Sequence, residues 1–121
     1  MLRRLALAAL IAAATSPAAA EPFRAEVAHM IALCWNTRPL SPEAQAASVT
    51  VAVEFDRDGV LLPGSVRLIA SNAPDPIAEE AFEAARRAVL RCGATGLPLP
   101  PDQYEHWRHM ELIFTAGAYI S

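Results

Sequence analysis

An alternating stretch at residues 48–56 is the feature that most constrains how this chain folds. Apolar side chains stand there at every second position, namely Val49, Val51, Val53 and Phe55. A period of two places all four side chains on one face of a β-strand. We therefore expect a half-buried strand in the middle of the chain.

A tight turn and a second strand follow directly. Residues 56–59 read Asp-Arg-Asp-Gly, in which Gly59 can adopt the positive φ that such turns require. A second strand is predicted at residues 60–71, interrupted by Pro63-Gly64, and Val66 and Leu68 continue the alternation there. The turn also resembles the opening of a calcium loop, but no bidentate glutamate follows at the required distance. The sequence therefore predicts a β-hairpin.

Two amphipathic helices are predicted on either side of the hairpin. In residues 23–35 an apolar stripe recurs at helical spacing, at Phe23, Val27, Met30, Ile31 and Cys34. A second helix is predicted from Asp75 to about Arg91, and its apolar stripe, which ends just beyond it, consists of Ala78, Ala81, Phe82, Ala85, Val89 and Cys92. Asp75 suits the N-cap of this helix, Pro76 its first position and Gly93 its end.

The last predicted element is a short strand at residues 110–115, which follows a proline-rich loop and a short helical turn near Tyr104. The element order is then α-β-β-α-β. It predicts an α+β fold in which two helices pack on a three-stranded antiparallel sheet. The side chains expected in its core are Val51, Val53, Phe55, Leu68, Phe82, Val89, Leu112 and Phe114.

Residues 1–20 have the features of a cleavable signal peptide. Two arginines open the segment, residues 5–14 are apolar and uncharged, and three small alanines end it. The apolar run is shorter than the ~20 strongly apolar residues that span a bilayer. We expect cleavage after Ala20 and a single exported domain over residues 21–121. The alternative is that residues 5–20 remain as a membrane anchor.

The charge of the chain excludes one broad class of partner. After residue 20 there are eight arginines, no lysine and thirteen acids, which is a net charge of −5, against −3 for the whole chain. Nucleic-acid binding depends on basic patches that neutralise phosphates. We therefore expect no nucleic-acid partner.

The two cysteines, Cys34 and Cys92, stand 58 residues apart. An even number of cysteines in a small exported domain predicts a disulfide. Two buried free thiols are the alternative. A thioredoxin-type redox pair is not expected, because there is no Cys-x-x-Cys motif.

No catalytic motif stands out in the sequence. It contains neither a Gly-x-Ser-x-Gly nucleophile motif nor a glycine-rich phosphate loop before a helix, so we expect no enzyme and no cofactor. His106 and His109 are spaced His-x-x-His, and on a helical turn they could share a metal with Glu105 or Glu111. A small metal-binding or hydrolytic protein that uses these histidines is therefore an alternative function.

Four stretches of the chain are similar to the C-terminal domain of TolA and, more broadly, to the TolA/TonB C-terminal fold. They are IALCWNTRP (31–39), VTVAVEFDRDGVLLPGSVRLI (49–69), AFEAARRAVLRC (81–92) and LPPDQYEHWRHMELIFT (99–115). The resemblance implies a non-enzymatic, periplasmic protein–protein interaction domain of the cell envelope. Its partner would be a periplasmic or outer-membrane-associated protein such as TolB.

One departure from full-length TolA bears on this function. TolA has an inner-membrane helix and a long spacer before this domain, whereas here the apolar N-terminal segment leads almost directly into the first predicted helix. We therefore expect a stand-alone module that has no contact with the membrane once the signal is cleaved. An inner-membrane-anchored energy transducer of the TonB/TolA type is the alternative.

The final strand is where we expect the partner to bind. A strand that comes last in the chain is expected at a sheet edge, where unpaired N–H and C=O groups can take up an extended peptide. The alternative is that residues 116–121 cover this edge and that it binds nothing. The predicted contact residues are Tyr104, Trp107, Glu111, Ile113 and Thr115.

Overall fold

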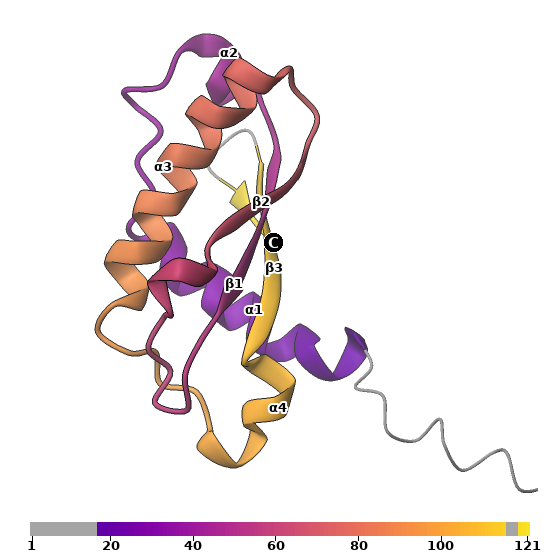
Figure 1. The fold of residues 1–121 in the computed structure, drawn as a ribbon, viewed down its shortest axis with the longest axis vertical. Coiled ribbons are helices and arrows are strands. Elements are labelled where there is room, and N and C mark those ends of the chain that lie inside the picture. Colours follow the sequence, from indigo (N-terminus) through magenta and orange to yellow (C-terminus); the bar gives the residue numbers. More distant parts are fainter. Residues whose placement is uncertain (1–16, 116–118) are drawn as a thin grey trace, which may run out of the picture.

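The computed structural model describes residues 17–115 and 119–121, which form an antiparallel sheet with helices packed on one face (Figure 1). The strand order is β2-β1-β3-β4. The strands are β1 (Val49–Glu54), β2 (Arg67–Ser71), β3 (His109–Thr115) and β4 (Tyr119–Ile120). The predicted α+β fold is confirmed, and β2, β1 and β3 are its three predicted strands. The two-residue β4 is an addition that the sequence pattern did not indicate.

Two long helices, α1 (Pro17–Ala32) and α3 (Asp75–Gly93), pack against each other and against the central strands. Burial alternates strictly along β3, where only every second side chain is buried. The helices therefore cover one face of the sheet, and the opposite face is open. The shorter elements are α2 (Pro42–Gln45), the 3-10 turns η2 (Pro63–Ser65) and η3 (Pro101–Gln103), and α4 (Tyr104–Trp107).

The core lies between the two long helices and the sheet. Six of the eight predicted core side chains are at most 1% exposed: Val51, Val53, Phe55, Val89, Leu112 and Phe114. Leu68 and Phe82 are only half-buried and pack against the margin of this core. α3 presents small side chains to the sheet, which allow its backbone to lie close to the strands: Ala81, Ala84, Ala85 and Ala88.

Cys34 and Cys92 form the predicted disulfide, and their Cα atoms are 6.0 Å apart. The bond joins the chain just after α1 to the last turn of α3. The disulfide thus holds the C-terminal ends of the two long helices together covalently. The alternative of two free thiols is wrong for this structure.

The predicted hairpin turn is confirmed. The Asp56 carboxylate oxygen Oδ1 accepts hydrogen bonds from the N–H groups of Asp58 (2.8 Å) and Val60 (3.0 Å). Gly59 has a φ of +76°. Both features are typical of a tight turn that begins with aspartate and ends with glycine.

The second strand of the hairpin is shorter than predicted. Residues 60–71 were expected to form it, but beyond one bridge between Phe55 and Leu61 the chain turns into η2, and β2 begins only at Arg67. Pro63 explains the difference, because proline has no N–H to donate to a strand ladder.

α3 begins one residue earlier than predicted. Pro74 occupies the N-cap position and Asp75 lies in the first turn, where it makes no capping hydrogen bond. A carboxylate in the first turn still interacts favourably with the helix dipole.

Most of the predicted signal peptide, residues 1–16, lies outside the described residues. α1 begins at Pro17 and contains Pro22, and its Phe23 side chain packs against the core. Within the part of the chain that the structure describes, no helix has the length and hydropathy needed to cross a membrane.

Candidate functional site

β3 pairs with β1 along six residues and with β4 near its end. The register with β1 runs without irregularity from Val49 opposite Phe114 to Glu54 opposite His109. β4 then pairs with Phe114 and Thr115 on the other side of β3. β3 is therefore a sheet edge, as expected, only along its first part. The C-terminal residues cover its second half, as the alternative expectation described.

Residues 109–111, called the free edge segment below, lie beyond the reach of β4. The Ile113 N–H donates to the Ser121 carbonyl (2.8 Å), and the Ser121 N–H donates to the Ile113 carbonyl (3.0 Å). The polar backbone groups of Ile113 thus point away from β1. Alternate residues of an antiparallel strand share this orientation, so the N–H and C=O of Glu111 also point away from β1. Within the described residues, no strand pairs with them there.

β2 forms the opposite edge of the described sheet, and it is irregular. Thr50 pairs with Ala70 while Val51 pairs with Leu68, so Ile69 is an extra residue that makes a β-bulge. Bulges twist an edge strand and hinder further pairing. β2 is therefore a poorer template for an added strand than the regular β3.

The residues predicted to contact a partner lie in different environments. Glu111 and Ile113 are exposed on the open sheet face, and Thr115 is already paired with β4. Trp107 is fully buried, and its indole Nε1 donates to the Pro100 carbonyl (2.8 Å). The prediction that Trp107 contacts a partner is wrong, because its side chain is part of the core.

Tyr104 joins α4 to the end of β1. Its hydroxyl donates to the Phe55 carbonyl (2.9 Å), and its ring meets the Trp107 ring edge-on with centroids 5.0 Å apart. The Arg57 guanidinium carbon lies 4.5 Å from the centroid of the Tyr104 ring. Tyr104 is half-buried, and its contacts support the start of β3 rather than offering a free surface.

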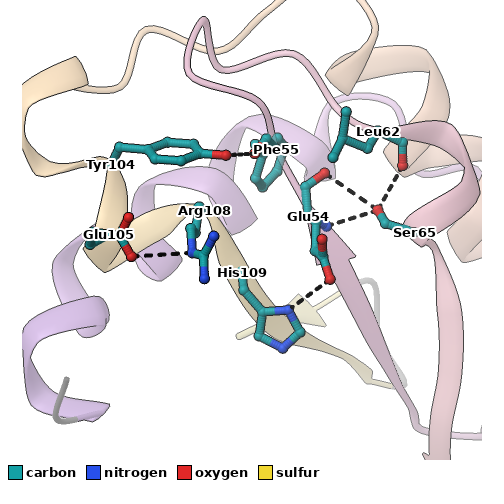
Figure 2. Close-up of polar contacts among 8 residues, drawn as sticks. All are labelled: Glu54, Phe55, Leu62, Ser65, Tyr104, Glu105, Arg108 and His109. Carbon is teal, nitrogen blue, oxygen red and sulfur yellow. Dashed lines mark hydrogen bonds and ion pairs between the residues drawn. The ribbon is translucent and has the colours of Figure 1, made fainter. Parts of the chain in front are cut away.

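One ion pair and one contact between a histidine and a carboxylate stand at the junction of α4 and β3 (Figure 2). Arg108 Nε lies 3.3 Å from Glu105 Oε1, and His109 Nδ1 lies 3.5 Å from Glu54 Oε2. All four side chains are about half exposed, so water screens these pairs and each stabilises the fold only weakly. Beside them is a cavity of about 130 Å³, lined by Glu54, Phe55, Tyr104, Arg108 and His109.

Ser65 is a structural residue that the sequence analysis missed. Its hydroxyl donates to the Leu62 carbonyl (2.6 Å) and accepts from the Glu54 N–H (2.9 Å), as Figure 2 shows. Ser65 thereby pairs with Glu54 on the side of β1 that faces β2, beyond the last residue pair of β1 and β2. The only sequence signal for this arrangement was the interruption of the alternation at Pro63.

His106 and His109 do not share a site. The His106 ring stacks on Phe23 with centroids 6.5 Å apart, whereas His109 pairs with Glu54. Across residues 17–115 and 119–121, no three histidine, cysteine, aspartate or glutamate side chains gather as metal ligands. The described residues therefore give no support to the metal-binding alternative.

Comparison of the chain with protein-family models, with curated proteins and with solved structures finds no match. The resemblance to the TolA/TonB C-terminal fold stays a prediction from the residues. The geometry of the free edge segment is the main structural basis for a functional proposal.

Proposed function

We propose that this chain is an exported, non-enzymatic interaction domain of the cell envelope that takes up an extended segment of a partner protein as an extra strand. The observation that carries the proposal is the outward-facing backbone of Glu111 in the free edge segment. Unpaired N–H and C=O groups on an edge are the template for such strand addition. The sequence resemblance to TolA/TonB C-terminal domains supports the same function.

The disulfide fits an exported location. A small domain has limited apolar surface to bury, and a cross-link between its helices compensates in an oxidising compartment. Structural disulfides persist mainly in such compartments, so the bond between Cys34 and Cys92 agrees with the signal peptide predicted over residues 1–20. The periplasm is the compartment we propose.

The partner strand is proposed to lie in line with β4. β4 already pairs with the last part of β3, which indicates that this edge can accept an antiparallel neighbour. A strand that continues this line would meet Glu111 and then His109. The bulge at Ile69 makes the opposite edge less suitable.

Two proline variants test this proposal. Glu111→Pro removes an N–H that points away from β1, so it blocks an added strand and leaves the ladder between β1 and β3 intact. Ser71→Pro is the matched control in β2, because the neighbouring Asn72 N–H donates to the Ser48 carbonyl, directly before β1, and the Ser71 N–H therefore faces outward. Both variants must first show the wild-type circular dichroism spectrum.

The variants are compared as baits for proteins of a periplasmic extract, and the affinity of each captured protein is then measured. We expect the wild type and Ser71→Pro to retain a partner that Glu111→Pro loses. Unchanged affinity for Glu111→Pro contradicts binding at β3, and a loss confined to Ser71→Pro assigns the interface to β2. If no protein is retained by the wild type, the interaction function itself is wrong.

A further inference from the structure

We propose that the strand added at the free edge segment is basic, with a lysine or arginine of the partner directly opposite Glu111. This inference rests on the proposed strand addition and specifies the chemistry of the partner. It is drawn from the position and the electrostatic surroundings of one side chain.

Glu111 differs from the other acids near this edge. Glu105 forms an ion pair with Arg108, and Glu54 Oε2 lies 3.5 Å from His109 Nδ1. The exposed carboxylate of Glu111 has no ion pair with any of the residues that the structure describes. Of these three acids, Glu111 is thus the one whose charge a partner could neutralise.

The neighbouring strand offers Glu111 no compensating charge. Its cross-strand partner in β1 is Ala52, and Arg67 lies one strand further away, opposite Ala52 in β2. Adjacent strands are about 4.8 Å apart, so the two inter-strand spacings from β3 to β2 place Glu111 and Arg67 roughly 10 Å apart. A cation on the vacant side of β3 would therefore lie closer to Glu111 than Arg67 does.

Strand addition would place a side chain at that vacant position. Because the N–H and C=O of Glu111 face outward, Glu111 would form a hydrogen-bonded pair with the opposing residue of the added strand. Residues that are paired in this way project their side chains on the same face, with Cβ atoms about 5 Å apart. Opposite charges at such a pair are stabilising and like charges destabilising. Ile113, on the same face and 42% exposed, adds an apolar contact for a neighbouring side chain.

The charge of the whole chain acts in the same direction. It is −3 overall and −5 after residue 20, so a basic segment is attracted from a distance. Two separate electrostatic effects therefore favour a basic partner: a local pair at Glu111 and a general field. The experiment must distinguish the local pair from the general field.

Two synthetic peptides serve as probes, acetyl-Arg-Val-Thr-Val-Thr-amide and acetyl-Glu-Val-Thr-Val-Thr-amide. With the first residue opposite Glu111, neither peptide reaches Ile113, with which Ser121 already pairs. Both favour an extended backbone, and they differ only in the charge of the first residue. We expect the arginine peptide to bind the wild-type protein about tenfold more tightly than the glutamate peptide at low salt. The reason is that arginine attracts the Glu111 carboxylate, whereas glutamate repels it. The preference should shrink as salt is added.

Charge reversal provides the test of the local pair. Glu111→Arg should reverse the preference, so that the glutamate peptide binds more tightly. Glu83→Arg, on the exposed side of α3, changes the net charge equally but lies away from the sheet, and it should keep the preference for arginine.

Each outcome decides the inference. Reversal in Glu111→Arg alone supports it. If both variants change the preference equally, only the general field acts, and the inference is overturned. Equal binding of the two peptides to the wild type, or binding of neither peptide, also overturns the inference. Strand addition is judged separately. If both peptides bind the wild type equally and Glu111→Pro abolishes this binding, the preference for a basic partner is overturned. The proposed binding site at the edge of β3 is then still supported.

Discussion

The hydroxyl of Tyr104 donates a hydrogen bond of 2.9 Å to the carbonyl oxygen of Phe55, and this contact holds α4 against the end of β1. The chain enters β3 directly after α4, where the Phe55 N–H donates to the Arg108 carbonyl (2.8 Å). Tyr104 thus helps to set where β3 begins, and with it the position of the free edge segment.

Tyr104→Phe removes this hydrogen bond and keeps the ring. We expect the free energy of unfolding to fall by about 1 kcal/mol, because the Phe55 carbonyl loses a buried donor. Urea unfolding of the variant and of the wild type measures the change. A stability equal to that of the wild type would mean that water replaces the hydroxyl at no cost.

Gly59→Ala should destabilise the hairpin by more than about 1 kcal/mol. Gly59 has a φ of +76°, and an added Cβ would collide with the backbone carbonyl of Leu97. Gly64→Ala is the control, since a Cβ there meets no atom within 4 Å. Thermal unfolding of both variants tests the prediction, and equal melting temperatures would contradict it.

Replacement of both Cys34 and Cys92 by alanine should lower stability by roughly 2–5 kcal/mol. The disulfide closes a loop across a sequence separation of 58 residues and so restricts the unfolded chain. Comparison with the oxidised wild type in guanidinium unfolding gives the difference. Titration of the denatured, non-reduced wild type should find no free thiol, and two free thiols would show that the bond does not form.

Phe114→Ala should cost more than Phe82→Ala. Phe114 is 1% exposed and meets the Trp35 ring edge-on, so its truncation leaves a cavity worth about 3–5 kcal/mol. Phe82 is only half-buried at the margin of the core, and we expect a loss of about 2 kcal/mol. Urea midpoints rank the two variants, and the reverse order would place the centre of the core nearer to Phe82.

The exported protein should begin at Glu21. Pro22 lies inside α1, where a proline lacks the N–H for the helical hydrogen bond and costs ~3 kcal/mol. After cleavage following Ala20 the same proline falls in the first turn of the helix, where it is tolerated. N-terminal sequencing of the exported protein provides the measurement. An intact N-terminus at Met1 would instead support the membrane-anchored alternative.

Local patterns in the sequence determined the elements themselves. The alternation at residues 48–56 predicted β1, the helical spacing of small apolar residues predicted α3, and Gly59 marked the turn between the strands. The disulfide also followed from composition. These inferences succeeded because side-chain periodicity and turn conformation depend on residues that are close in the chain.

Only the tertiary structure decided which backbone groups stay free. β4 covers the end of β3, the bulge at Ile69 distorts β2, and Trp107 turns into the core instead of outward. The bulge and the burial of Trp107 depend on pairing and packing across the fold, which the local pattern does not encode. β4 is close to β3 in the chain, but its two residues are too few for an alternating pattern to indicate a strand. The exposed position of Glu111 was predictable from the alternation in β3. That no strand pairs with the outward side of β3 at Glu111, within the described residues, followed only from the strand order.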